Sequence, residues 1–166
     1  MLTLILGGAR SGKSAWAERR AATLPRPVTY LATALVGDDD MAARVVTHQL
    51  RRPPGWRTVE AGLDLAEAAA AIDGTLLLDS LGAWVARIPG FAAEGGALAT
   101  VLQLRRGDSV VVSEEVGLGV HPASQAGRQF RDALGEVNQA VSAVADEVLL
   151  VVAGRALRLA DLGDGS

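Results

Sequence analysis

The residues best suited to chemistry lie near the start of the chain, which reads GGARSGKS from Gly7 to Ser14. This segment fits the pattern G-x-x-x-x-G-K-[ST]. Its glycines let the backbone curl until successive N–H groups point inward, toward phosphate oxygens at the N-terminus of the next helix. In such a loop Lys13 bridges the β- and γ-phosphates of a nucleotide, and the Ser14 hydroxyl holds Mg²⁺. Lys13 is also the single lysine among 16 basic residues. The motif therefore predicts a nucleotide-phosphate site at residues 7–14.

Acidic residues that follow two apolar runs are candidates for the metal ion beside this loop. Asp79 follows the run TLLL, and the pair Glu114-Glu115 follows SVVVS. Open α/β sheets bind ligands at the carboxyl ends of their strands, which is where all three acids would lie. Each acid could equally be a turn residue that ends its strand. The sequence does not choose between them.

One of the two histidines has arginine neighbours. On a helix from Asp38 to Arg52, His48 would share an arc of ~100° with the arginines at positions 44, 51 and 52. A histidine on a solvated helix face is the simplest interpretation. The alternative is an anion-binding face that carries a nucleophile, because nearby guanidinium groups keep imidazole neutral and stabilise a pentavalent phosphorus. His121 follows two loop glycines and is expected to be a solvated loop residue.

Strands and helices alternate along the chain and must position these residues. Apolar runs predict strands at Leu2–Leu6, Val28–Ala32, Thr75–Asp79, Ser109–Ser113 and Glu147–Val152, with an edge strand at Ala156–Leu159. The predicted helices are Lys13–Ala22, Asp38–Arg52, Leu63–Ile72, Leu81–Ala86, Ala97–Arg106 and Arg128–Ala145. The last helix has a core-facing stripe of Phe130, Leu134, Val137, Val141 and Val144. Alternation of this kind predicts an α/β architecture around a mostly parallel sheet with right-handed crossovers.

Composition narrows the class of protein further. The 166 residues are 49% hydrophobic and 21% charged, which predicts one folded domain spanning residues 1–166. The absence of cysteine excludes a disulfide scaffold and a cysteine nucleophile. A net charge of −3 does not suggest a nucleic-acid partner. No apolar run approaches the ~20 residues of a membrane span. We expect a soluble, cytoplasmic domain.

Several segments together resemble one family, the bifunctional adenosylcobinamide kinase/adenosylcobinamide-phosphate guanylyltransferases of cobalamin biosynthesis. The segments run in order from Leu2 to Gly154: GGARSGKS, DDDMAARVVTH, PPGWRTVE, SEEVGLGVHP and GRQFRDALGEVNQAVSAVADEVLLVVAG. The EVG-x-G loop and the last segment are far more specific than the phosphate loop. The resemblance implies a P-loop NTPase fold of the RecA-like type, with three layers around the mostly parallel sheet. It further implies GTP, ATP and Mg²⁺ as cofactors, adenosylcobinamide as substrate, and homo-oligomers, expected to be trimers.

The resemblance also implies roles for single residues. His48 ends the stretch D-D-x-M-x-x-R-x-x-x-H and matches the family's guanylylated histidine, which favours the nucleophile interpretation; Lys13 joins it in catalysis. Ser14, Asp79 and Glu115, the acid of the EVG loop, are the expected metal ligands, with the choice between the two acids left open. The implied guanine nucleotide site consists of Gly7, Gly8, Ala9, Arg10, Ser11, Gly12, Lys13, Ser14, Thr33, Ala34, Leu35, Gln49, Leu50, Arg51, Arg52, Glu60 and Asp79.

The chain departs from the family pattern in three places. Thr47 precedes His48 where some members have two adjacent histidines, and Asp40 stands where glutamate is more usual. The span Ile88–Gly107 matches little, so corrinoid contacts cannot be carried over to it.

Three functions are consistent with these residues. The first is a bifunctional enzyme that phosphorylates adenosylcobinamide with ATP or GTP. It then transfers GMP from GTP through a guanylyl-histidine, giving adenosylcobinamide-GDP. The second is a plain P-loop small-molecule kinase in which His48 takes no part. The third is a regulatory or assembly ATPase module. The position of His48 among arginines argues against the plain kinase.

Overall fold

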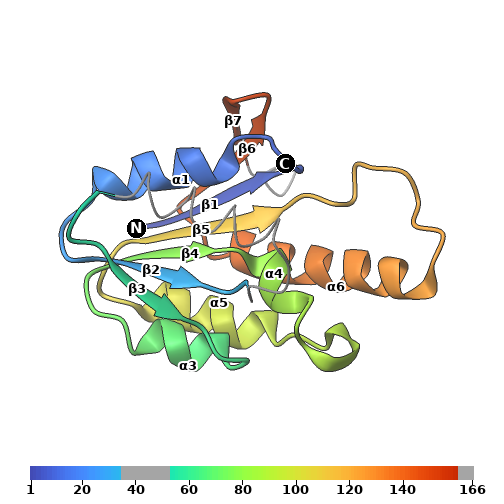
Figure 1. Ribbon diagram of the computed structural model, residues 1–166, viewed down its shortest axis with the longest axis horizontal. Helices are drawn as coiled ribbons and strands as arrows, with labels where there is room; N and C mark the ends of the chain where they lie inside the picture. Colours follow the sequence, from blue (N-terminus) through green and yellow to red (C-terminus); the bar gives the residue numbers. More distant parts are fainter. Residues whose placement is uncertain (35–52, 161–166) are drawn as a thin grey trace, which may run out of the picture.

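A seven-stranded sheet forms the middle layer of the protein (Figure 1). The computed structural model describes residues 1–34 and 53–160. The strands are β1 (Leu2–Gly7), β2 (Val28–Ala32), β3 (Arg57–Glu60), β4 (Thr75–Asp79), β5 (Ser109–Glu114), β6 (Glu147–Val152) and β7 (Arg155–Leu159). Their order across the sheet is β3-β2-β4-β5-β1-β6-β7. The strand pairs are parallel except for the antiparallel hairpin β6–β7 at one edge. The predicted mostly parallel α/β sheet is confirmed.

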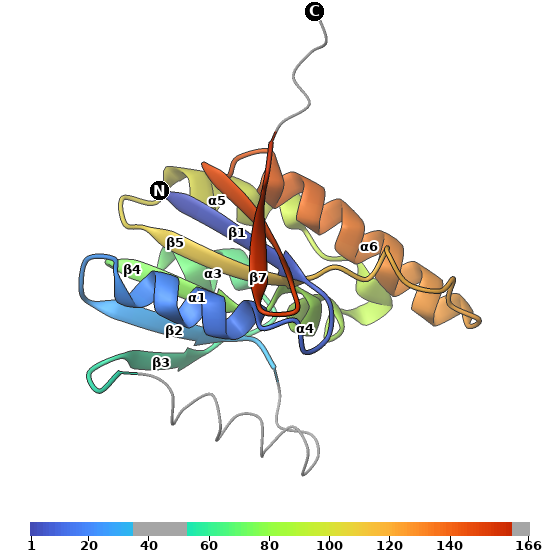
Figure 2. The ribbon, with the colours of Figure 1, turned by 90° about the horizontal axis from the view of Figure 1, so that it is seen from above.

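Helices cover both faces of this sheet and complete the three layers (Figures 1 and 2). The helix α1 (Lys13–Ala22) packs on one face. The opposite face carries α3 (Leu65–Ala70), α4 (Leu81–Val85), α5 (Gly95–Leu104) and α6 (Gln125–Ser142), with the short 3-10 helix η1 (Pro89–Phe91) between α4 and α5. Within the two described ranges, no helix is both long enough and apolar enough to cross a membrane. The predicted helix Asp38–Arg52 lies outside the described residues.

The alternation of side chains along β1 explains why the sheet has a core on each face. Leu4 belongs to the cluster beneath α3–α6, and its neighbour Ile5 belongs to the cluster beneath α1. Both side chains are fully buried. A parallel strand covered on both faces must be apolar on both sides, which is why continuous apolar runs identified these strands.

The long helix α6 presents its predicted stripe to the larger core. Leu134, Val137 and Val141 are buried in that core, while Phe130 packs at its margin. Phe130 meets Phe91 of η1 edge-on, with ring centroids 5.7 Å apart. The helix begins three residues before the predicted start because Ser124 caps it, its Oγ accepting a hydrogen bond from the Gly127 N–H at 3.0 Å. This helix covers the strands that lead to the site.

Candidate active site

The phosphate-loop motif occupies the turn between β1 and α1 at the carboxyl edge of the sheet (Figure 1). Gly7 is the last residue of β1, and a Cβ atom there would lie 2.7 Å from the Val151 carbonyl oxygen. Gly12 has a φ of 95°, a backbone region that side chains disfavour. Both motif glycines are therefore required by the local geometry. The predicted strand–loop–helix context is confirmed.

The single lysine folds back across this loop. Lys13 Nζ donates a hydrogen bond to the Gly8 carbonyl at 3.4 Å and lies 3.5 Å from Glu114 Oε1. The strand register explains the second contact, because β5 is the neighbour of β1 and places Glu114 beside Gly7. The ammonium group is held at the mouth of the loop, with its side chain 12% exposed. This is the position from which it can reach phosphate oxygens.

Glu114 is anchored by both its side chain and its backbone. Its Oε2 accepts a hydrogen bond at 3.0 Å from the Gly82 N–H near the start of α4. Its carbonyl accepts from Asn138 Nδ2 of α6 at 3.1 Å, and Asn138 Oδ1 in turn accepts from the Ser113 hydroxyl at 2.6 Å. A side chain at position 82 would collide with the Glu114 carboxylate, so glycine makes room for the acid. The helices α4 and α6 thus hold Glu114 in place at the end of β5.

The other two acidic candidates have hydrogen-bond partners of their own among the described residues. Asp79 ends β4, which β5 separates from β1, and its Oδ2 accepts a hydrogen bond from the Tyr30 hydroxyl at 3.1 Å. Glu115 Oε1 accepts from the N–H of Gly117 in its own loop at 2.6 Å. The sequence pattern leaves Glu114 and Glu115 together as candidates for the metal ion, and the family resemblance favours Glu115. Glu114 is the acid that contacts Lys13, and the metal-binding role of Glu115 stays a prediction.

The predicted residues after β2 and at the end of β3 lie at the same edge of the sheet. Thr33 is buried, and its Oγ1 bonds both the carbonyl and the N–H of Ser80, each at 2.7 Å. Arg87 Nη1 donates to the carbonyls of Thr33 and Ala61, at 2.7 and 3.0 Å. Arg87 was not predicted, because nothing in its local sequence indicates that it joins the ends of two strands. Ala34 and the exposed Glu60 lie at this edge too.

Six predicted site residues lie outside the described part of the chain. These are Leu35, His48, Gln49, Leu50, Arg51 and Arg52. The described chain stops at Ala34, just after β2, and resumes at Pro53, before β3. The predicted roles of these six residues stay predictions.

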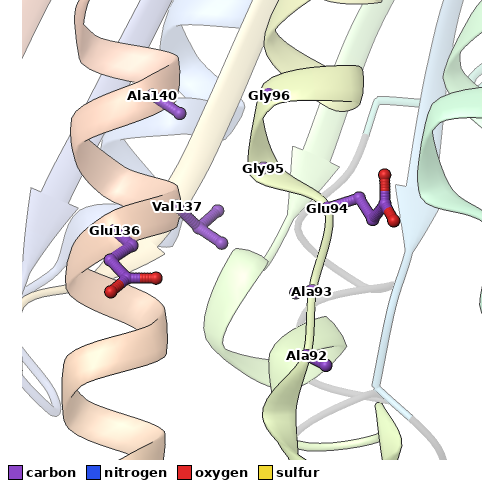
Figure 3. A pocket seen from close by; sticks show the side chains of 8 residues that line it. All are labelled: Ala92, Ala93, Glu94, Gly95, Gly96, Glu136, Val137 and Ala140. Carbon is purple, nitrogen blue, oxygen red and sulfur yellow. The ribbon is translucent and has the colours of Figure 1, made fainter.

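A separate groove lies between α6 and the start of α5 (Figure 3). It has a volume of about 440 Å³, and none of the predicted nucleotide residues within the described ranges lines it. Its lining is Ala92, Ala93, Glu94, Gly95, Gly96, Glu136, Val137 and Ala140. The other histidine of the chain, His121, is exposed, and its Nδ1 lies 2.9 Å from Arg131 Nη1. Neither feature contacts the phosphate loop.

Comparison with known proteins supports the family resemblance seen in the sequence. The family model described as cobinamide kinase / cobinamide phosphate guanyltransferase matches residues 3–159. The bifunctional adenosylcobalamin biosynthesis protein CobP of Pseudomonas aeruginosa is 40% identical over 163 residues, covering 93% of this chain and 94% of that protein. The protein CobU of Salmonella typhimurium, described in the same words, is 37% identical over 181 residues, covering 96% of this chain and 99% of that protein.

Among solved structures, an ATPase from a bacterial type III secretion system is similar, with a TM-score of 0.54 and 16% identity. The match covers 90% of this chain and 50% of that one, and it supports the P-loop ATPase type of fold alone. The family match spans nearly the whole chain, including the phosphate loop and the acids that end β4 and β5. The chain therefore belongs to the cobinamide kinase / cobinamide phosphate guanyltransferase family.

Proposed function

We propose that this chain phosphorylates adenosylcobinamide and then transfers GMP from GTP to the phosphorylated product. The observation that carries the proposal is the phosphate loop between β1 and α1, with Lys13 held 3.5 Å from the Glu114 carboxylate. Phosphoryl transfer needs backbone donors and a cation to bind and neutralise the phosphates, and an acid to help hold the metal ion. The loop, Lys13 and Glu114 offer these groups. Membership of the family supports both reactions.

In the kinase step the chain supplies binding and orientation. The N–H groups of residues 7–14 would hold the β- and γ-phosphates, and Lys13 would leave Glu114 to contact their oxygens. Ser14, Asp79 and Glu114 or Glu115 offer the oxygen donors that Mg²⁺ prefers. When bound, Mg²⁺ neutralises charge that develops on the phosphates. The corrinoid hydroxyl then attacks the γ-phosphorus. The new O–P bond forms as the bond to the β-phosphate oxygen breaks, the nucleoside diphosphate leaves, and the hydroxyl proton passes to solvent.

In the transferase step His48 is the proposed nucleophile. A neutral imidazole nitrogen attacks the α-phosphorus of GTP, the new N–P bond forms, and the bond to pyrophosphate breaks. A phosphate oxygen of the corrinoid phosphate next attacks the same phosphorus, which breaks the N–P bond and frees the imidazole. The arginines at 44, 51 and 52 would stabilise the charge on the phosphorus oxygens.

GTP labelled at the α- or the γ-phosphorus tests this proposal. The bifunctional enzyme retains acid-labile α-label on the protein, whereas a plain kinase retains none and moves only γ-label to the corrinoid. We expect His48→Ala to lose the covalent label and the transferase while keeping substantial kinase activity. Lys13→Ala should lower both reactions, and His121→Ala serves as the control for a histidine outside the site. Acid-labile α-label that persists in His48→Ala would contradict the assignment.

A further inference from the structure

The turn of the edge hairpin lies against the phosphate loop (Figure 2). The Gly154 N–H donates a hydrogen bond to the Ser11 carbonyl at 2.8 Å. The Gly154 carbonyl accepts from Trp16 Nε1, in the first turn of α1, at 3.2 Å. A Cβ atom on Gly12 would lie 3.4 Å from Gly154 Cα. One residue of the turn therefore touches both the loop and the helix that follows it.

The geometry of the hairpin explains why this residue is available. Ala153 and Gly154 have φ values of 50° and 77°, and they are the two residues between the paired Val152 and Arg155. In a two-residue turn of this kind, the flanking residues Val152 and Arg155 form the last pair of the hairpin. The N–H and carbonyl of Gly154 are left to point outward, where Ser11 and Trp16 are their partners.

The contact to Ser11 orients a donor of the phosphate loop. The peptide bond between Ser11 and Gly12 is planar and trans, so its carbonyl and its N–H point in opposite directions. Since the Gly154 N–H holds the carbonyl, the Gly12 N–H must point away from the hairpin. That N–H is one of the backbone donors expected to bind phosphate oxygens.

We propose that Trp16 is a positioning residue for nucleotide binding. Its indole N–H donates to the Gly154 carbonyl, and the Gly154 N–H donates to the Ser11 carbonyl. These two hydrogen bonds fix the direction of the Gly12 N–H before the phosphates bind. Preorganised donors bind more tightly because less order must be gained on binding. The inference rests on the proposed function, since it assumes that nucleotide phosphates occupy the loop.

Trp16→Phe tests the proposal because it removes the indole N–H and keeps an aromatic ring. Trp84→Phe is the matched control, since Trp84 Nε1 donates a similar hydrogen bond, at 2.8 Å, to the Leu63 carbonyl away from the loop. Dissociation constants are measured by titration calorimetry with GTP and with tripolyphosphate, which probes the loop without a nucleoside. We expect Trp16→Phe to weaken both by about fivefold, the value of one net hydrogen bond, and Trp84→Phe to leave both unchanged.

Gly154→Asn provides a second variant, because asparagine tolerates a positive φ and keeps the backbone N–H and carbonyl. It should bind both probes like the wild type.

Hydrogen exchange of the peptide covering residues 8–15 needs no ligand, and it should be faster in Trp16→Phe than in Trp84→Phe. Unchanged affinity together with unchanged exchange in Trp16→Phe would overturn the proposal. So would a loss confined to GTP, because the indole would then contact the nucleoside. A wild-type protein that binds neither probe would instead contradict the proposed function. The exchange experiment would still test whether the contacts of Gly154 with Trp16 and Ser11 order the loop.

Discussion

Replacing Glu114 by glutamine separates how tightly the phosphate loop binds nucleotide from how fast it turns nucleotide over. In the structure the Glu114 carboxylate lies 3.5 Å from Lys13 Nζ. Bound phosphates must draw the ammonium away from that carboxylate and also lie near its negative charge. Removing the charge therefore favours the bound state.

The structure sets the size of this effect. Two unit charges 3.5 Å apart interact by about 1 kcal/mol in water and about 5 kcal/mol at an effective dielectric constant of 20. The Glu114 side chain is 29% exposed, so the net value lies near the lower figure, about 1 kcal/mol. The dissociation constant of GTP without Mg²⁺ should fall by about fivefold. Glutamine keeps an oxygen that can accept from the Gly82 N–H, so the free energy of unfolding should change by less than about 1 kcal/mol.

Turnover should move in the opposite direction. With Mg²⁺ present, loss of the ionised oxygen beside the loop should lower kcat of the kinase by roughly tenfold or more. Calorimetry without metal and steady-state kinetics with metal measure the two effects on one preparation.

Glu115→Gln is the matched control, since it removes the same charge from the adjacent residue, whose carboxylate bonds its own loop. Tighter GTP binding in Glu115→Gln together with wild-type binding in Glu114→Gln would refute the reasoning. It would mean that Glu115, and not Glu114, is the acid that opposes the phosphates.

Two further substitutions test the supports of the site and of the sheet. Asn138→Leu leaves the Ser113 hydroxyl and the Glu114 carbonyl without their partner, so urea denaturation should show a loss of about 2 kcal/mol, and turnover should fall because the end of β5 shifts. Arg105 donates to the carbonyls of Ala69, Ile72 and Gly74 at the opposite edge of the sheet, and burial lowers the pKa of its guanidinium while Asp73 opposes that shift. Arg105→Met should therefore cost about 3 kcal/mol in the same assay and leave the dissociation constant of GTP unchanged. Equal losses of nucleotide affinity in Arg105→Met and Asn138→Leu would contradict this division.

The elements that depend on local pattern were predictable from the sequence. The strands β2, β4 and β6 and the helix α1 have the predicted bounds, because an apolar run or a phosphate-loop motif specifies each of them locally. The strand β3 was not predicted. It is a short edge strand with mostly exposed side chains, and its pairing with β2 is what makes it a strand. No apolar run marks such a segment.

The candidate site was predictable in its composition but not in its contacts. The motif identified Lys13 and the acids at strand ends, because each signal lies within a few residues. The choice between Glu114 and Glu115 as the partner of Lys13 depends on β5 lying next to β1 and on glycine at position 82, which are facts of tertiary structure. Arg87 was missed for the same reason, since its partners Thr33 and Ala61 come from distant parts of the chain.

The pairing of β1 with β6 has a consequence for the synthesis of the chain. Residues 7–14 are made before β6 and β7, yet Gly7 pairs with Val151, and the Ser11 carbonyl meets its partner only at Gly154. Contacts this distant in sequence form slowly in folding, because closing a long loop costs entropy before the contact can stabilise the fold. A nascent chain on the ribosome therefore contains the whole phosphate motif long before it contains β6, the strand that pairs with β1 beside the motif. The motif is short, but the site it forms depends on two segments that lie far apart in the sequence.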